Sequence, residues 1–221
     1  MERGVMRKLV AAGLVICLAS LILGCGGQEG GVEAERPAAL NEDPAAVNED
    51  QVREWFDAYI AAHNSHDIEA ELALYADEVI FEVPQNTALM RREDLRPRFE
   101  WEAVTDSQLS MAGIDIDGNT VTIKNFVETS SWLQLAGIAE IVYEPGTKIV
   151  FADGLITEVL PSSPVAESQE AIGAVMDELM TWVMENHPEE LEGMENGQLP
   201  YDGTGARKLL ELLAAWREAQ Q

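Results

Sequence analysis

WFDAYIAAHNSHDIEAELALYADEVIFEV, residues 55–83, contains two helical patterns followed by a strand pattern. Apolar residues at spacings of three and four predict one buried stripe that ends at His63. Its members are Val52, Trp55, Phe56, Tyr59 and Ile60. Asn64 and Ser65 break this helix, and Asp67 is a good N-cap for a second helix. The second stripe comprises Ile68, Leu72, Tyr75 and Ala76, and VIFEV at 79–83 predicts a strand that Pro84 stops.

The chain beyond residue 84 alternates between further helix and strand patterns. Residues 85–93 are predicted to form a loop, and Asp94 to cap a third helix. The stretch 109–129, with the turn Asp117-Gly118-Asn119, predicts a β-hairpin. SWLQLA at 131–136 predicts one helical turn, and three strands are expected at 138–143, 148–151 and 155–160. After a Pro/Ser break at 161–164, apolar stripes predict two more helices.

This order of elements predicts an α+β fold, in which helices pack against the concave side of a curved antiparallel sheet. Together with FADGLITEV at 151–159, the stretch 55–83 resembles the nuclear-transport-factor-2-like superfamily, and its SnoaL-like branch most closely. The resemblance covers residues 49–161. It implies a cone-shaped half-barrel wrapped on three N-terminal helices and enclosing an apolar pocket. Members of the family include cyclases, ketosteroid-isomerase-like enzymes, dehydratases and non-catalytic binding domains, often as dimers.

The N-terminus has the pattern of an export signal. A basic head precedes fifteen apolar residues at 9–23, a run shorter than the roughly 20 residues of a membrane span. Ile22 to Cys25 (ILGC) resembles a bacterial lipobox, which implies removal of residues 1–24 and lipidation of Cys25. The other cysteine, Cys17, lies within the removed segment, so the mature chain has no disulfide pair. We therefore expect an extracytoplasmic protein anchored to a bacterial membrane, facing the periplasm if the cell has an outer membrane.

Composition divides the mature chain and limits its partners. Residues 25–48 are rich in Gly, Ala, Pro and Glu and predict a flexible tether between the lipid and the domain at 49–161. Residues 162–221 are expected to form a helical extension packed on that domain. Without residues 1–24 the chain has 11 basic and 39 acidic residues, a net charge of −28. Such a charge excludes nucleic acid and anionic lipid headgroups as partners.

Candidate site residues follow from position on the predicted elements. His63 is a catalytic candidate because it continues a buried stripe, although a hydrogen-bonded histidine at the edge of the core is the alternative. Glu128 is the other candidate base, since it lies among apolar strand residues, with a solvent-facing position beside Lys124 as the alternative; Tyr59 would be the donor. Pocket-lining candidates are Trp55, Trp101, Asn125, Trp132 and Tyr143. His66 and Asp67 are interpreted as a helix junction, and Arg91, Arg92, Arg96 and Arg98 as a solvated mixed-charge helix start.

Metal and nucleotide cofactors are not expected. The helix break at Asn64 and Ser65 separates His63 from His66, no Cys/His cluster completes a metal site, and no phosphate-binding Gly-rich motif occurs. The favoured interpretation is a lipid-anchored domain that binds a small apolar or amphipathic ligand or an envelope partner, without catalysis. One alternative is an isomerase or cyclase that works by acid–base proton transfer in the cone. The other is an interaction module whose sheet face forms a homodimer.

Overall fold

The computed structural model describes residues 48–83, 86–191 and 199–221. The expected signal peptide, Cys25 and nearly all of the expected tether lie outside these residues. No helix within the described ranges is both long and apolar enough to cross a membrane. In chain order the elements are α3 (Glu49–Ser65), α4 (Ile68–Ala73), β1 (Tyr75–Val83), β2 (Asn86–Arg91), the 3-10 turn η1 (Arg92–Leu95), α5 (Arg96–Val104), β3 (Gln108–Asp117), β4 (Thr120–Thr129), α6 (Ser131–Ala136), β5 (Ile141–Tyr143), β6 (Thr147–Ala152), β7 (Leu155–Leu160), α7 (Ala166–Asn186), η2 (Pro188–Leu191) and α8 (Gly203–Ala219).

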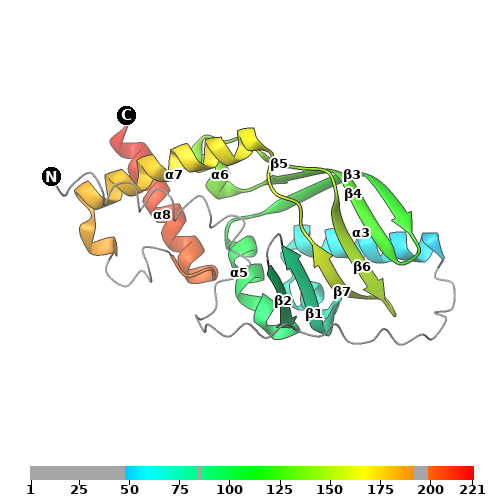
Figure 1. Cartoon of the computed structure of the whole chain (residues 1–221). Coiled ribbons are helices and arrows are strands. Elements are labelled where there is room, and N and C mark those ends of the chain that lie inside the picture. The colour runs from blue at the N-terminus through cyan, green and yellow to red at the C-terminus, as the bar shows by residue number, and fades with distance from the viewer. Residues whose placement is uncertain (1–47, 84–85, 192–198) are drawn as a thin grey trace.

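The strands form one curved sheet in the order β2-β1-β7-β6-β4-β3, with β5 paired to β4 (Figure 1). All neighbours are antiparallel except β1 and β7, which run parallel. The predicted α+β class and the mainly antiparallel curved sheet are therefore confirmed. The hairpin of β3 and β4 is also confirmed, with Asp117 opposite Thr120 at its end.

Helix α3 lies along the sheet, and its apolar stripe forms the first core cluster (Figure 1). Asn48 caps the helix by accepting a hydrogen bond from the Asp50 amide. The buried members of this cluster come from α3, α4, η1, α5 and the strands; they are Val52, Phe56, Tyr59, Leu72, Tyr75, Val79, Phe81, Leu95, Phe99, Leu109, Val121, Ile123, Ile149, Phe151 and Ile156. The interior of the sheet's curve thus holds a packed apolar core.

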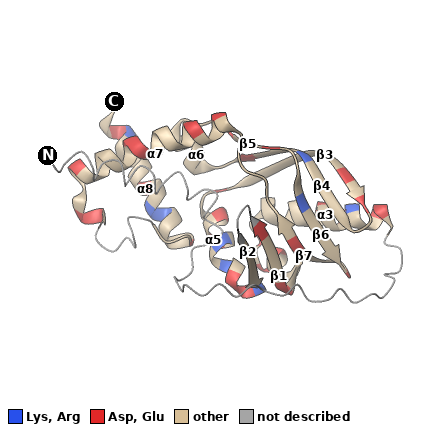
Figure 2. Cartoon of the chain, in the orientation of Figure 1, with Lys and Arg blue, Asp and Glu red and all other residues tan. Residues whose placement is uncertain are grey.

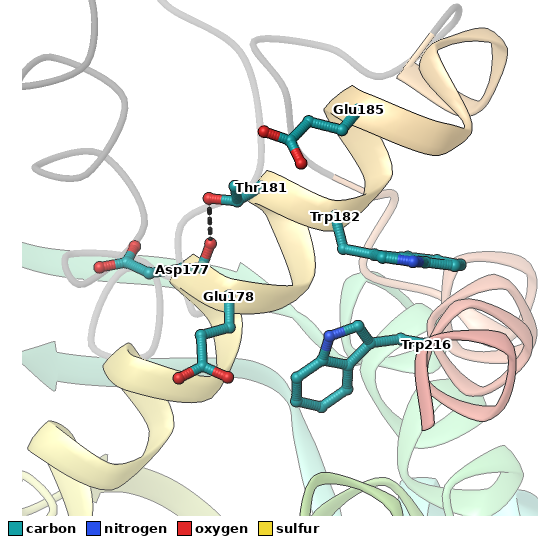
Figure 3. A pocket seen from close by; sticks show the side chains of 6 residues that line it. All are labelled: Asp177, Glu178, Thr181, Trp182, Glu185 and Trp216. Carbon is teal, nitrogen blue, oxygen red and sulfur yellow. Dashed lines mark hydrogen bonds between the residues drawn. The ribbon is translucent and has the colours of Figure 1, made fainter. Parts of the chain in front are cut away.

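Helices α6, α7 and α8 build a second core cluster at the other end of the molecule (Figure 1). Its fully buried members include Leu133 of α6, Val183 of α7 and Leu213 of α8. The start of α8 lies against α5, and a Cβ on Gly205 would lie 1.8 Å from the main-chain oxygen of Pro200. Only glycine permits this close approach. A shallow pocket of about 400 Å³ lies on α7 and α8 (Figure 3).

Asp94, expected to cap the third helix, lies inside η1, and the N-cap of α5 is Leu95, without a side-chain hydrogen bond. Two other local predictions were also wrong. Residues 86–91, expected as part of a loop, form strand β2, because they pair with residues 78–83 of β1. Tyr75 and Ala76, expected on a helical stripe, begin β1 instead. Tyr75 pairs with Ile156 of β7, and the Ile156 amide donates to the Leu74 carbonyl. In both cases main-chain pairing across the sheet outweighs local helix and loop preferences.

Charges are distributed unevenly (Figure 2). Acidic residues occur on helices at both ends of the molecule, and several basic residues lie in and around α5. Arg96 pairs there with Glu69 at 2.6 Å and with Glu93 at 3.1 Å, both at exposed carboxylates. Arg91 likewise pairs with Asp94 at 3.0 Å. The mixed-charge interpretation of this helix start is confirmed for these pairs, each of which contributes little to stability.

Candidate functional site

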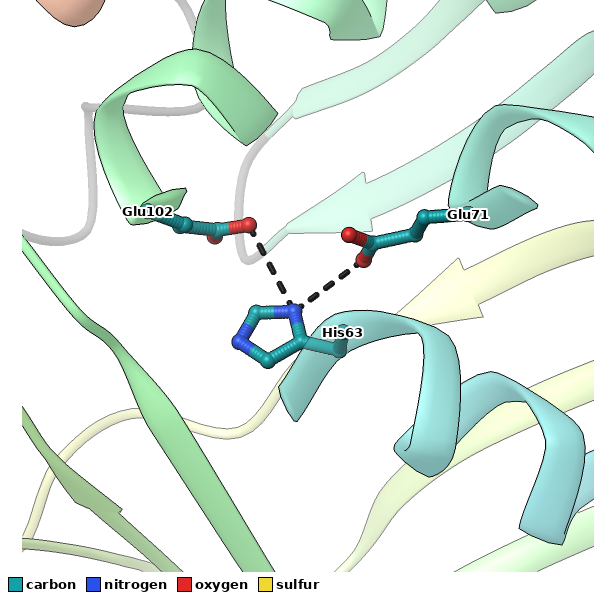
Figure 4. A group of neighbouring side chains, drawn as sticks. All are labelled: His63, Glu71 and Glu102. Atoms are coloured by element: carbon teal, nitrogen blue, oxygen red, sulfur yellow. Dashed lines mark hydrogen bonds and ion pairs between the residues drawn. The ribbon is translucent and has the colours of Figure 1, made fainter. Parts of the chain in front are cut away.

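His63 lies in the last turn of α3 and is 2% exposed. Its Nδ1 is 3.0 Å from Oε1 of Glu71 and 3.6 Å from Oε2 of Glu102 (Figure 4). The two carboxylates are 3% and 8% exposed and come from different helices, α4 and α5. We call these three side chains, together with Arg98, whose own side chain is 33% exposed, the buried ionic cluster. It lies beside Tyr59 and Tyr75 of the first apolar core.

The helix junction after α3 brings Glu71 to His63. His66 ends α3 in a left-handed conformation, with φ of 57°. Asp67 then caps α4 by accepting a hydrogen bond from the Ala70 amide, as the sequence predicts. This sharp turn folds α4 back, so that its first turn places Glu71 against the last turn of α3. His66 itself lies at the surface side of the junction, with Nε2 2.9 Å from Asp106.

Arg98 holds the other carboxylate. Its Nε donates to Oε1 of Glu102 at 2.8 Å, one helical turn away on α5. With His63 protonated, the cluster contains two positive and two negative charges and is neutral. Charge balance matters here, since an uncompensated buried charge costs several kcal/mol. Arg98 therefore differs from its neighbours Arg92 and Arg96, whose partners Asp77 and Glu69 are largely exposed.

The pKa values of His63, Glu71 and the neighbouring Tyr59 are all raised above their ordinary values. Burial alone would lower the pKa of His63, but the charge of Glu102 and the hydrogen bond to Glu71 together raise it. Burial raises the pKa of Glu71, and the hydrogen bond from His63 offsets only part of this effect. The pKa of Tyr59 is also raised, mainly by burial and then by Glu71. Burial is thus the main cause at Glu71 and Tyr59, whereas at His63 the two carboxylates outweigh burial.

Two polar atoms of the cluster have no hydrogen-bond partner among the described residues: Nε2 of His63 and Oε2 of Glu102. Figure 4 shows Nε2 on the side of the imidazole away from both carboxylates. A buried polar atom left unsatisfied costs about 1–3 kcal/mol, and most buried polar groups in native proteins are paired. These atoms are therefore the places where the interior could receive the polar group of another molecule.

Glu128 forms a second polar group in the interior. The Tyr143 hydroxyl donates to its Oε2 at 2.7 Å, and the Ser107 hydroxyl donates to its Oε1 at 3.1 Å. Burial raises the pKa of Glu128, and the Tyr143 hydrogen bond offsets part of that rise. The Tyr143 ring stacks on Phe126 at 4.2 Å between centroids. Both oxygens of Glu128 thus have donors, unlike Glu102 with its one unpartnered oxygen.

The remaining candidates from the sequence do not lie together at one site in the structure. Tyr59 lies one turn before His63 and is buried, with ring centroids 6.4 Å apart. Trp55 packs on Phe151 near the middle of α3, about two turns before His63. Asn125 is exposed on β4. The other two tryptophans lie toward the second cluster: Trp132 is buried within it, and Trp101 packs on Tyr201 at 4.9 Å.

The ligand atoms of His63, Glu71 and Glu102 lie within 4.8 Å of one another, so this trio has the donor set of a small divalent-metal site. Charge disfavours that use. A divalent cation bound with neutral His63 would give the cluster, Arg98 included, a net charge of +1. A single proton on His63 instead makes the cluster neutral. The geometry therefore fits a shared proton better than a metal ion.

Sequence reasoning missed Glu71 and Glu102, although a signal for each exists. Glu71 follows Ile68 by three residues, and Glu102 follows Phe99 by three. A spacing of three places each carboxylate on the same helix face as an apolar residue of the core. Arg98 was noted only as part of a solvated run, and its position four residues before Glu102 identifies it as a partner.

Comparison with known proteins gives one family match. Residues 52–159 match the family described as SnoaL-like domain. No curated protein matches the chain. Among solved structures, a protein of Kribbella flavida DSM 17836 provisionally named a ketosteroid isomerase is 22% identical, with 52% of this chain and 78% of that chain covered and a TM-score of 0.41.

Two further structures are similar over about the same segment. An NTF2-like protein of unknown function from Cytophaga hutchinsonii ATCC 33406 is 13% identical, with 52% and 91% of the two chains covered and a TM-score of 0.40. A protein of unknown function with a cystatin-like fold from Methylobium petroleophilum PM1 is 14% identical, with 55% and 80% covered and a TM-score of 0.42. The chain is thus similar to the SnoaL-like domain family over residues 52–159, just under half of its length.

Proposed function

We propose that the SnoaL-like domain binds a small, mostly apolar molecule by one polar group, without catalysis. The observation that carries this proposal is the pair of unpartnered buried atoms, Nε2 of His63 and Oε2 of Glu102. Tyr59 and Tyr75 of the first core cluster lie beside these groups, and this packed core would have to open to admit the rest of the ligand. A ligand hydroxyl suits either atom, since it can donate to a carboxylate or accept from an imidazole N–H. Because Nε2 lies on the side of the ring away from both carboxylates, one hydroxyl would reach only one of the two atoms.

The two unpartnered atoms belong to side chains that other charged groups hold in place, which favours ligand binding. Glu71 fixes the imidazole through Nδ1, and Arg98 fixes the carboxylate through Oε1. Each ligand-facing atom is thus held from behind by a second charged group, which keeps the ordering cost of binding low. Because the cluster is neutral, an uncharged ligand would enter it without leaving a charge unbalanced.

We further propose that the domain acts on the outer side of a membrane. The lipobox-like ILGC sequence supports lipidation at Cys25, and residues 25–48 would form the tether. At about 5–6 Å × √n, this tether would hold the domain roughly 25–30 Å from the lipid. Labelling with a radioactive fatty acid tests this part. The label should enter the wild type and be absent from Cys25→Ser.

Acid–base catalysis is a second candidate, favoured by one contact. Glu71 accepts from Nδ1 of His63, an arrangement that fixes the tautomer and leaves Nε2 to transfer a proton. An isomerase or cyclase of this kind would exchange the protons next to a carbonyl. Incubation with 2-tetralone in D₂O tests it: deuterium uptake that is lost in His63→Gln would support catalysis and contradict a purely binding role.

The binding proposal is tested by NMR with 2-naphthol and naphthalene, which differ by one hydroxyl. The chain has three histidines, so the His63, His66 and His187 ring signals can be followed separately. We expect 2-naphthol to shift the His63 signal saturably and to bind at least tenfold more tightly than naphthalene. Glu102→Gln should reduce that preference. The proposal fails if the two compounds bind alike, or if only the His66 signal moves.

A further inference from the structure

The pocket on α7 and α8 lies in the second core cluster and shares no residue with the buried ionic cluster. Its volume is about 400 Å³, and its lining combines acidic and aromatic side chains: Asp177, Glu178, Thr181, Trp182, Glu185 and Trp216. Figure 3 shows the two indole rings one above the other on the side of α8, with the Glu178 carboxylate next to Trp216 and the other polar groups along α7. The site is therefore a groove with an aromatic wall and an acidic wall.

No lysine or arginine lies near the acidic wall in the sequence. Helix α7 has five acidic residues in 21 positions and no lysine or arginine. Asp177, Glu178 and Glu185 are exposed, and no ion pair joins them to a basic side chain within the described parts of the chain. Three uncompensated carboxylates around one groove give it a negative potential, which raises the local concentration of cations.

Trp216 supplies an observation independent of charge. Its side chain is 4% exposed and lines the pocket, yet its Nε1–H makes no hydrogen bond to any described residue. Figure 3 shows this nitrogen on the ring edge that faces Trp182 and α7. The guanidinium of Arg217 covers a face of the Trp216 ring at 5.2 Å, so the group that Trp216 offers to the pocket is its N–H edge. This N–H is not among the fully buried unpartnered atoms, so it is open to the pocket and available to an acceptor there.

From these features we propose that the pocket binds a small organic cation that also carries a hydroxyl or carbonyl oxygen. The carboxylates would attract the positive charge, and the half-buried Trp182 ring would contact it through a cation–π interaction. The ligand oxygen would accept from Trp216 Nε1. A weakly hydrated quaternary ammonium gains most from an aromatic face, and a hydroxylated one such as choline is the simplest molecule with both features.

Choline and its neutral isostere 3,3-dimethyl-1-butanol test the proposal. The full chain is titrated at pH 8 in maltoside micelles, which keep the apolar N-terminal run in solution. The five tryptophans give five indole N–H signals in a ¹H–¹⁵N spectrum, assigned with Trp182→Phe and Trp216→Phe. We expect choline to shift the Trp216 signal saturably in the millimolar range, and the neutral isostere to bind at least fivefold more weakly.

A matched pair of double variants separates a site from general attraction to an acidic protein. Asp177→Asn with Glu178→Gln should weaken choline binding by about 2–5-fold per carboxylate, a typical size for exposed ion pairs. Glu167→Gln with Glu170→Gln makes the same charge change on exposed positions of α7 away from the pocket and should leave binding unchanged. The proposal is overturned if both double variants weaken binding equally, if the isostere binds as well as choline, or if NaCl at equal ionic strength produces the same shifts.

Discussion

Glu71→Gln tests the charge balance of the buried ionic cluster. Glutamine keeps the size and an oxygen opposite His63 Nδ1 at 3.0 Å but removes the negative charge. A hydrogen bond to a charged group contributes about 1.5–3 kcal/mol and a neutral one about 0.5–1.5 kcal/mol, so we expect a loss of about 1–2 kcal/mol at pH 6. Glu71→Ala removes the partner altogether and should cost about 3–5 kcal/mol. Urea unfolding followed by tryptophan fluorescence measures both losses.

The dependence on pH gives the sharper result. Because the folded pKa of His63 is raised, its proton stabilises the fold below pH 6.5, and this stabilisation is lost as the pH rises through the folded value. The raised pKa of Glu71 acts in the same direction from pH 4.5 upward. Each proton contributes a slope of at most about 1.4 kcal/mol per pH unit. Above pH 6.5 the wild type should therefore lose stability more steeply than Glu71→Gln.

The control is Glu82→Gln, the same chemical change on an exposed side chain of β1. Its unfolding free energy should stay within about 0.5 kcal/mol of the wild type. Its pH curve should also run parallel to that of the wild type. If the wild type and Glu71→Gln gave parallel curves from pH 5 to 9, the cluster would not hold its protons as argued.

Three further substitutions test packing and the second polar group. Gly205→Ala would place a Cβ 1.8 Å from the Pro200 oxygen, so calorimetry should show a loss above about 2 kcal/mol; an unchanged melting temperature would contradict this close approach. Tyr143→Phe removes the 2.7 Å hydrogen bond to Glu128 and should cost about 1–3 kcal/mol and raise the pKa of that carboxyl further, as ¹³C NMR of the side chain would detect. Leu213→Ala empties a fully buried position of the second cluster and should cost about 2–5 kcal/mol in urea unfolding, whereas a loss below 1 kcal/mol would mean that α8 is loosely packed.

The parts of the fold that sequence reasoning identified correctly have local signals. Asp67 caps α4, and the Asp117-Gly118-Asn119 turn joins β3 to β4. The break predicted at Asn64 and Ser65 was wrong by two residues, because α3 runs through both and its C-cap is His66. Strand β2 and the start of β1 could not be identified in this way. The start of β1 pairs with β7 about 80 residues away, so the information that decides its conformation is outside any local window. Strand β2 pairs with β1 directly before it in the chain, so its conformation depends on that strand and not on its own residues alone.

The candidate site could likewise be predicted only in part from local sequence signals. The burial of His63 could be predicted because it continues the apolar stripe of its own helix. Its partners Glu71 and Glu102 were missed because carboxylates usually face solvent, as most acidic residues of so acidic a chain do. Glu71 and Glu102 meet His63 only because three helices converge, and that convergence depends on the helix junction at His66 and on the packing of α5.

The parallel pairing of β1 with β7 has a consequence for the order of folding. It joins Tyr75 to Ile156 and Phe81 to Val159, so the chain must close a loop of about 80 residues before these strands meet. Such closure costs entropy before any contact repays it, which makes folding slow. During synthesis, the hairpin of β1 and β2 exposes one edge until residue 160 has emerged. Chains truncated before β7 should therefore aggregate through that edge instead of folding.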